Sequence, residues 1–600
     1  MLRPADSLDL QTLGARLRSG ELSPSHVVAG VIERIAARGD DKAWIHVVPR
    51  AELEARAAEL ERRGASGLPL YGIPFAIKDN IDLAGHPTTA ACPEYAYVAQ
   101  NSASVVQALL DAGAIAIGKT NLDQFATGLV GVRSPYGAPS STFDSRYISG
   151  GSSSGSAVVV AAGVVSFALG TDTAGSGRVP AAFNNLVGLK PTCGLLSTSG
   201  VVPACRSLDC VSIFALTAGD AASVLDVAAK FDSGDPYSRR ERAAAAPTAI
   251  AGCRIGVPRA SQLEFFGNRD AQKLFEGAVA KLAQLGAKTL EIDFAPFLAT
   301  ARLLYEGPWV AERYVAIREF IDRKPGALHP VTRQITLGGA RPTAAECFSA
   351  QYKLRALIRD AEPAWKAVDV LIAPTAGTTY TIAEVEADPI RLNSNLGVYT
   401  NFVNLMDLSA IAVPAGFTSA GLPFGVTLLA PAFSDRALCA LGDELHRALV
   451  ETMGATRLPL PAATTKPARS GVRLAVCGAH LSGLPLNHQL TERGARLVRA
   501  CRTAPHYRLY ALAGFTPPRP GMVRESGGRR IEVEVWELST EAFGSFVDGI
   551  PAPLGIGTVE LEDGKQVKGF LCEPYATRGA RDVSHLGGCL LYTSPSPRDS

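Results

Sequence analysis

The sequence predicts an α/β protein with a mixed central sheet flanked by helices, followed by a small β-rich α+β domain. Short apolar runs at residues 72–77, 114–117 and 370–373 alternate with helical patterns such as that of 271–285, an alternation typical of α/β folds. The chain has 600 residues, whereas a single hydrophobic core stops growing at roughly 250 to 300 residues. Two or more domains are therefore expected.

Two elements of the first domain follow from local chemistry. Ser23 and Pro24 supply an N-cap and a first-turn proline, so an amphipathic helix is expected to begin there. The apolar run at 157–169 is shorter than the ~18 residues that a membrane span requires. It therefore predicts a buried core helix.

Domain boundaries follow from changes in composition. Residues 457–470 read RLPLPAATTKPARS, where prolines and small polar residues interrupt any periodic pattern. We therefore expect a first domain at 1–455, a linker at 456–471 and a β-rich second domain at 472–589. The segment 590–600 has no apolar period and is expected to be a non-native tail.

Charge and cysteine usage argue against several classes of protein. The formal net charge is +2 and the basic residues are scattered, so neither nucleic acid nor an anionic membrane is an expected partner. The 11 cysteines are dispersed, without a CxxC pair or zinc-ligand spacing, which indicates reduced thiols, no metal and no cofactor. The first residues lack the apolar region of a secretory signal, so the expected compartment is the cytoplasm.

The candidate active site lies in two clusters rich in glycine and serine. They read GGSSSGS at 150–156 and GTDTAGSGRVP at 170–180. Segments so free of side chains let the backbone approach a ligand and direct N–H groups at it, as an oxyanion hole requires. A flexible linker is the alternative interpretation, but linkers do not alternate with a buried apolar run such as 157–169.

A serine nucleophile in these clusters needs a base. The chain has nine histidines, and His86 is the only one between His46 and His329, so we consider a lysine base instead. Lys78 ends the run YGIPFAIK and is thus expected at a strand end, where catalytic groups of α/β folds often lie. An ordinary surface lysine is the competing interpretation.

Lys78 and the two clusters, in this order, resemble the amidase signature family over roughly residues 1–455. The resemblance implies that Ser176 is the nucleophile, that Ser152 lies in a cis peptide and relays the proton, and that Lys78 is the base. It also implies an oxyanion hole made by the backbone N–H groups of Thr173, Ala174, Gly175 and Ser176. The chain departs from the commoner family pattern at three positions outside the triad, Ser154, Ala174 and Gly177.

The run LYEGPWVAERY at 304–314 resembles the substrate-binding helix of the allophanate hydrolases within that family. This resemblance implies that Tyr305 and Arg313 hold the substrate. A guanidinium suits a small carboxylate because its planar fork pairs both oxygens, and the spacing places the two residues about two turns apart on a similar helix face. A solvated surface ion pair is the alternative for Arg313.

The segments 476–490 and 569–588 resemble the C-terminal domain of allophanate hydrolases, which has a γ-glutamylcyclotransferase-like fold. The resemblance implies that His480 supplies a proton for decarboxylation. Histidine is suited to this role because it titrates near neutral pH. His488 and His585 are the alternatives, and a structural hydrogen-bonding role is open for each of the three.

A competing motif is GAIAIGKT at 113–120, which fits the phosphate-loop pattern GxxxxGK[ST]. Its four variable positions are Ala-Ile-Ala-Ile, which predict a strand and not a loop. We therefore expect no phosphate-binding loop here.

Together these resemblances imply hydrolysis of allophanate to ammonia and carbon dioxide, a step of urea degradation. The first domain would deaminate allophanate to N-carboxycarbamate, and the second would assist its decarboxylation. The alternatives are a glutamine-hydrolysing amidotransferase subunit, an amidase of another small amide, and an inactive partner-binding module. The expected partners are the substrate and a separate urea carboxylase or biuret-producing enzymes, and the expected oligomeric state is a homodimer.

Overall fold

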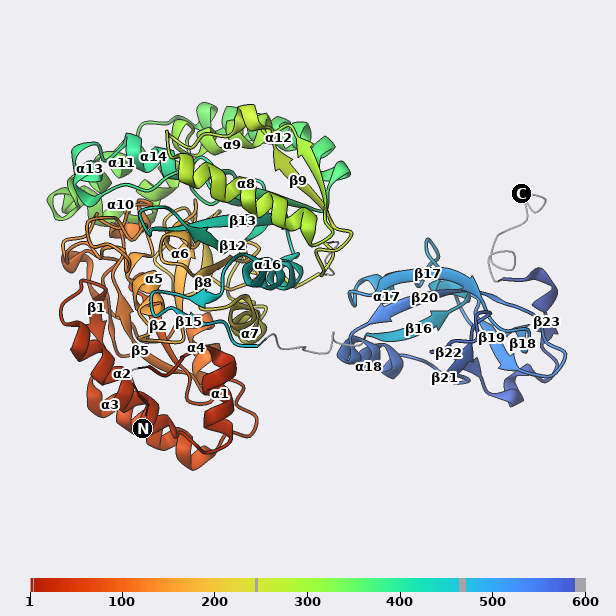
Figure 1. The fold of residues 1–600 in the computed structure, drawn as a ribbon. Helices are drawn as coiled ribbons and strands as arrows, with labels where there is room; N and C mark the ends of the chain where they lie inside the picture. Colours follow the sequence, from red (N-terminus) through yellow and green to blue (C-terminus); the bar gives the residue numbers. More distant parts are fainter. Residues whose placement is uncertain (1, 4, 243–245, 463–470, 589–600) are drawn as a thin grey trace. The chain divides into compact units, whose positions relative to one another are not determined.

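The computed structural model describes residues 2–3, 5–242, 246–462 and 471–588. This part of the chain divides into two compact units, the first of which ends at Ala462. The expected tail at 590–600 lies outside the described residues. Figure 1 shows a large sheet surrounded by helices in the first unit and smaller sheets in the second.

An 11-stranded mixed sheet forms the centre of the first unit, in the order β1-β5-β2-β6-β8-β7-β12-β13-β11-β9-β10. The pairs β5–β2, β2–β6, β11–β9 and β9–β10 are parallel and the others are antiparallel. The mixed central sheet is thereby confirmed. Its strands are β1 (Trp44–Val47), β2 (Pro74–Lys78), β5 (Ile115–Thr120), β6 (Phe167–Asp172), β7 (Val187–Lys190), β8 (Cys210–Ala215), β9 (Arg254–Pro258), β10 (Lys288–Ile292), β11 (Val370–Pro374), β12 (Leu408–Phe417) and β13 (Pro423–Pro431).

Helices cover this sheet along its whole width. In Figure 1, α1, α2 and α3 gather beside β1, β5 and β2, whereas α8, α9 and α12 surround β9. The helices of this unit are α1 (Leu10–Arg18), α2 (Pro24–Arg38), α3 (Arg50–Arg63), α4 (Ser104–Asp111), α5 (Ser154–Ala161), α6 (Val179–Phe183), α7 (Ala218–Ala228), α8 (Arg269–Gln284), α9 (Ala295–Glu306), α10 (Val310–Arg323), α11 (Pro330–Gly338), α12 (Ala344–Ala367), α13 (Ile382–Ala387), α14 (Arg391–Leu396), α15 (Phe402–Leu405) and α16 (Asp435–Leu449).

Local sequence signals account for several of these elements. The side chain of Ser23 accepts from the N–H of His26 and caps α2, which begins at Pro24 as predicted. The motif at 113–120 forms strand β5 and no phosphate loop, because its apolar residues pair with β2 on one side and with β1 on the other.

Two predictions about boundaries need correction. The run at 157–169 is not one helix: α5 ends at Ala161, Gly163 adopts a left-handed φ of 68°, and Phe167 begins β6. Pairing with β2 and β8 therefore prevails over helical continuation. The expected linker also overlaps the first unit, because Leu458–Pro459 forms strand β15 against β14 (Thr452–Met453).

The second unit is built on two small sheets, which confirms its β-rich character. One has the order β17-β20-β16-β22-β21 and the other has the order β19-β18-β23. Its likeness to the γ-glutamylcyclotransferase fold stays a prediction. The elements are β16 (Val472–Val476), α17 (His488–Thr491), β17 (Arg496–Arg502), β18 (Tyr507–Ala511), β19 (Pro520–Arg524), β20 (Glu532–Leu538), α18 (Thr540–Asp548), β21 (Leu554–Glu560), β22 (Gln566–Cys572) and β23 (Arg581–Asp582).

Membrane-spanning helices were searched for among the described residues. None of the helices there combines the length and the apolar character that crossing a bilayer requires.

Candidate active site

Lys78 lies at the carboxyl end of strand β2, an interior strand of the large sheet between β5 and β6. Strand β2 is parallel to β6, so the carboxyl ends of the two strands meet at the same edge of the sheet. There the Lys78 Nζ donates to Ser152 Oγ at 2.8 Å and to Thr171 Oγ1 at 2.7 Å. The sequence analysis did not single out Thr171, which is the second acceptor of this amine.

The charge state of Lys78 is set by its burial. The side chain is 0 % exposed, and both of its hydrogen-bond acceptors are uncharged hydroxyl groups. Burial lowers the pKa of the amine from its usual 10.5 to about 7, although Asp123 and Asp172 nearby oppose this shift. A large part of the Lys78 population is therefore neutral at physiological pH and able to accept a proton.

Ser152 is held at the start of helix α5, which follows the cluster GGSSSGS. The peptide bond between Gly151 and Ser152 is cis, as the resemblance to the amidase signature family implies. The Ser152 carbonyl accepts from the Asp123 N–H at 3.0 Å, and the Gly151 N–H donates to Leu129 O at 2.8 Å. A Cβ atom at Gly151 would lie 2.1 Å from Asp123 Oδ2, so only glycine fits this close approach.

Asp172 organises the second glycine and serine cluster. Its buried carboxylate accepts from the backbone N–H groups of Gly175 and Gly177 and from both ends of the Arg178 guanidinium. Burial alone would raise the pKa of Asp172, but Arg178, Lys190 and the Gly177 N–H together hold it below its usual value. The carboxylate therefore stays charged and fixes the shape of the loop that carries Ser176.

These contacts modify our expectation for the oxyanion hole. The Gly175 N–H donates to Asp172 Oδ1 at 2.8 Å, so it is already committed to an intramolecular anion and does not point freely at a substrate. The expected set is thereby reduced to the N–H groups of Thr173, Ala174 and Ser176, none of which donates to Asp172. Gly175 itself has a φ of 132°, a backbone conformation that favours glycine.

Ser176 is 3 % exposed and lies against a segment that sequence reasoning did not identify. Within the described residues its Oγ donates to Gly128 O at 3.4 Å and makes no hydrogen bond to Ser152. Catalytic hydrogen bonds often tighten only in the complex with substrate, so the relay from Ser176 to Ser152 stays a prediction. The sequence signal that could have revealed this segment is its two closely spaced glycines, Gly128 and Gly131. In the structure both have positive φ values.

Asp123 also stabilises the segment that contains Gly128. Its carboxylate accepts from the backbone N–H groups of Val130, Gly131 and Arg133. The segment 123–133 is thus fixed by a second buried carboxylate, in the way that Asp172 fixes the loop of Ser176.

Arg313 and Tyr305 also converge on this segment. Arg313 on α10 is 4 % exposed, and its Nη1 donates to Ala126 O at 3.2 Å and to Thr127 Oγ1 at 3.1 Å. These acceptors immediately precede Gly128, whose carbonyl accepts from Ser176 Oγ.

Tyr305 on α9 lies beside the same site. It packs with Ala174 in one apolar cluster, and the centre of its ring lies 5.9 Å from the Arg313 guanidinium carbon. The alternative of a solvated surface arginine is wrong, because Arg313 is buried.

His480 of the second unit lies in an aromatic environment. Its ring stacks on Phe570 with centroids 5.1 Å apart and meets Phe546 edge-on. Nε2 lies 3.0 Å from Gln489 Oε1, and burial lowers the pKa of the imidazole. His480 is therefore neutral at physiological pH, and the geometry is compatible with the structural role that the sequence left open.

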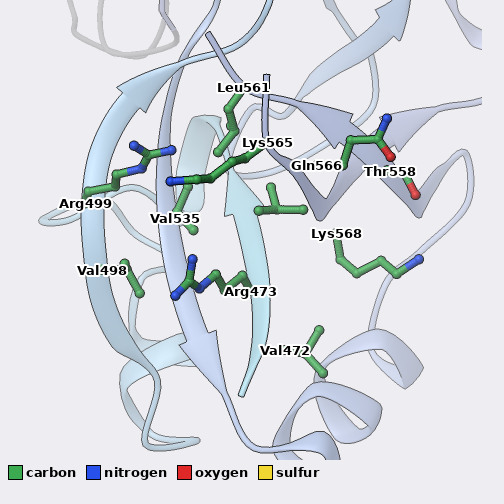
Figure 2. Close-up of a pocket in the computed structure, with 11 residues that line it drawn as sticks. Val472, Arg473, Val498, Arg499, Val535, Thr558, Leu561, Lys565, Gln566 and Lys568 are labelled. Carbon is green, nitrogen blue, oxygen red and sulfur yellow. The ribbon is translucent and has the colours of Figure 1, made fainter. Parts of the chain in front are cut away.

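A separate pocket of about 530 Å³ opens on the five-stranded sheet of the second unit. Figure 2 shows Arg473, Arg499 and Lys565 directed toward one region of it, with Lys568 on another side. Acidic partners offset much of this charge: Asp563 pairs with Arg499 at 2.8 Å and with Lys565 at 3.4 Å, and Glu537 pairs with Arg473 at 3.8 Å. A lining rich in Arg and Lys can attract small anions to the extent that its charge is not offset in this way. His480 is not among the lining residues.

A buried lysine that hydrogen-bonds to a serine beside a second, glycine-rich loop is an arrangement typical of hydrolases that use serine and lysine in place of histidine. Comparison with protein families makes the class specific. The chain belongs to the Amidase family, whose model matches residues 26–439, and the model described as Allophanate hydrolase C-terminal domain matches residues 472–594. The second match extends into the segment that we expected to be non-native.

Similar proteins support the same two-part architecture. The structure of Kluyveromyces lactis allophanate hydrolase is 42% identical, covers 97% of this chain and 98% of that chain, and superposes with a TM-score of 0.76. The urea amidolyase of Saccharomyces cerevisiae is 45% identical over 92% of this chain, but the chain spans only 31% of that protein. The structure of the peptide amidase from Stenotrophomonas maltophilia is 28% identical, covers 74% of this chain and 96% of its own, and superposes with a TM-score of 0.63.

The lowered pKa of Lys78 predicts a specific dependence of stability on pH. Between about pH 7 and 10.5 the amine is neutral when folded and protonated when unfolded, so the unfolded state binds one more proton and stability rises with pH. Relative to Lys78→Met, the wild-type protein should gain up to about 1.4 kcal/mol per pH unit in this window. Thermal unfolding of both proteins at several pH values measures the difference, and parallel curves would show that the Lys78 pKa is not depressed.

Proposed function

We propose that this chain hydrolyses allophanate, with Ser176 as nucleophile, Ser152 as proton relay and Lys78 as base. The observation that carries the proposal is the 2.8 Å hydrogen bond between the buried Lys78 amine and Ser152. A neutral amine takes the Ser152 proton while Ser152 takes that of Ser176, and Ser176 Oγ attacks the terminal amide carbonyl. Ammonia leaves with the relayed proton, and water then hydrolyses the acyl-enzyme to N-carboxycarbamate.

The oxyanion of the tetrahedral intermediate would be stabilised by backbone N–H groups. Thr173, Ala174 and Ser176 provide these donors, while Gly175 contributes through its bond to Asp172, which fixes the loop. Such preorganised donors act strongly in a site that excludes water. The burial of Lys78, Ser152 and Ser176 supplies that condition.

Allophanate differs from most amidase substrates in its carboxylate. Arg313 is the cation that we assign to it, because its guanidinium contacts residues adjacent to the Ser176 contact at Gly128. Its two hydrogen-bond acceptors, Ala126 O and Thr127 Oγ1, are neutral, and Asp209 acts on its charge electrostatically. Tyr305 beside Arg313 would position the same end of the substrate.

The experiment that tests this function is a comparison of substrates. Ammonia release is measured with allophanate, malonamate, biuret and glutamine, and we expect allophanate to be preferred. Ser176→Ala should lower kcat by roughly 10⁴-fold or more, since members of one proton relay cannot replace each other. The matched control is Ser154→Ala in the same cluster, whose Oγ contacts Asn121 O. Glutamine as the best substrate would instead favour an amidotransferase subunit.

Arg313 is tested by a change of charge geometry. Arg313→Lys should lower kcat/KM for allophanate and malonamate by roughly 100-fold, because a point charge cannot replace a planar fork, while uncharged malonamide should be affected much less. Arg318→Lys is the matched control, since Arg318 lies on the same helix and is 67% exposed. An equal loss with malonamide would show that Arg313 only supports the segment at Ala126.

The second unit is proposed to assist decarboxylation of N-carboxycarbamate. This reaction delivers a proton to nitrogen as the bond to carbon dioxide breaks. His480 is the candidate proton donor from the family resemblance, although its neutral buried ring would have to be protonated first. The cationic pocket of Figure 2 is suited to holding the intermediate, which is an anion.

His480 is tested by following the intermediate itself. With ¹³C-labelled allophanate, His480→Asn should lengthen the lifetime of N-carboxycarbamate by roughly 100-fold, as the loss of a general acid does, without slowing the first release of ammonia. The exposed His488 provides the control variant, His488→Asn. Early time points at alkaline pH limit spontaneous decarboxylation. Equal lifetimes in the three proteins would assign His480 a structural role.

The wider context of the reaction is part of this proposal. The urea amidolyases that match the chain are about three times longer, so we propose that a urea carboxylase activity lies outside this sequence. We also propose that the protein acts as a homodimer in the cytoplasm. Biuret from s-triazine breakdown is the other proposed origin of the substrate.

A further inference from the structure

A second buried lysine, Lys190, has two cysteine sulfur atoms and no carboxylate among its contacts in the described residues. Lys190 ends strand β7 and is 0 % exposed. Its Nζ donates to Pro191 O at 2.7 Å and lies 3.7 Å from Cys210 Sγ and 3.9 Å from Cys193 Sγ. Across the described residues, no carboxylate forms an ion pair with this amine.

A buried ammonium is stabilised by anions close to it. Asp172 and Asp435 act on Lys190 electrostatically without contacting it, and the two sulfur atoms are the groups in contact with the amine that can supply a further anion. The neighbouring Cys210 thiol and the charge of Lys190 together lower the pKa of the Cys193 thiol, and the Lys190 pKa is raised in turn despite its burial. Cys193 therefore has a substantial thiolate population near neutral pH, and in its thiol form it donates to Leu208 O at 3.5 Å. The residue is partly exposed.

Cys210 connects this cluster to the catalytic loop. Its Sγ–H donates to Asp172 O at 3.1 Å, and the two residues pair in register between β6 and β8. Asn404 Nδ2 supports the same carbonyl at 2.8 Å. Asp172 is the residue whose carboxylate holds Gly175 in the loop that carries Ser176.

We propose that Cys193 and Cys210 form a peroxide-sensitive dithiol that controls the geometry of the active-site loop. The Cys193 thiolate attacks hydrogen peroxide, the O–O bond breaks, and Cys193 becomes a sulfenic acid while hydroxide leaves. The Cys210 sulfur then attacks the sulfenic sulfur, and the Cys210 proton leaves with that hydroxyl group as water. The two sulfurs lose two electrons in total and peroxide takes them up.

Disulfide formation changes the contacts on which the loop depends. The Cys210 hydrogen bond to Asp172 O is lost, because the sulfur no longer carries a proton. The thiolate beside Lys190 is lost in the same step, so this buried cation loses the anion in direct contact with it. Both changes act next to Asp172, so oxidation should displace the donors that surround Ser176.

The first readout is chemical and needs no substrate. The purified full chain is treated with hydrogen peroxide, the remaining thiols are alkylated, and peptides are analysed by mass spectrometry. We expect a Cys193–Cys210 cross-linked peptide with the loss of two hydrogen atoms, reversed by dithiothreitol. Cys193 left as an unchanged thiol, or oxidised without a bond to Cys210, would overturn the proposal.

The second readout is amide hydrolysis. Oxidation should lower kcat by roughly tenfold to 100-fold, because small displacements of positioned groups cost this much, and dithiothreitol should restore it. Cys193→Ser and Cys210→Ser should each abolish the sensitivity to peroxide. The matched control Cys253→Ser removes a buried thiol whose pKa burial raises to about 11, so it should stay sensitive. A wild-type rate that is unchanged when the disulfide is complete would overturn control of the loop.

One measurement avoids variants that fail to fold. In the wild-type protein, alkylation of Cys193 by iodoacetamide should reach half of its maximal rate near pH 7, because the thiolate is the reactive form. A midpoint near that of a free thiol would contradict the ion pair with Lys190. Since neither alkylation nor cross-linking depends on the substrate, failure of this inference is distinguishable from failure of the proposed function.

Discussion

The burial of one amine, that of Lys78, is the constraint on which the rest of the site depends. A lysine can act as a base at neutral pH only if its charged form is made unfavourable, and burial at the end of β2 does this. The cost of removing this group from water requires a rigid surrounding in which both acceptors are already in place. The large sheet provides that surrounding, since it fixes Thr171 at the neighbouring strand end.

Three buried lysines at strand ends of one sheet show how the partner decides the role. Lys119 lies 3.2 Å from Asp79, a carboxylate with which it forms a buried ion pair. Lys190 lies beside two sulfur atoms, whereas Lys78 has only hydroxyl acceptors. Their sequence contexts are similar apolar strands, so the difference is created by residues that come from elsewhere in the chain. The same principle explains why two buried carboxylates, Asp123 and Asp172, hold loops and leave the proton transfer to other groups.

The sequence predicted the architecture and the strand that carries Lys78, because apolar runs and capping residues are local signals. It did not predict that the run at 157–169 divides into a helix and a strand, since pairing of Phe167 with β2 is a long-range contact. Nor did it identify Thr171 or the segment around Gly128, because their importance arises only when distant strands meet. The bond from the Gly175 N–H to Asp172 was not foreseen for a related reason: the motif alone does not place that carboxylate beside the loop.

The loops around Ser176 and Ser152 leave no room for side chains at Gly151 and Gly175. A Cβ atom at Gly175 would lie 2.4 Å from Thr400 Oγ1, and the approach at Gly151 is closer still. Variation in these loops is therefore constrained by the backbone, whereas α9 and α10 face the same site with ordinary side chains such as Tyr305. New substrate preferences should consequently arise, in evolution or in the laboratory, by exchange of helix residues on an unchanged catalytic frame.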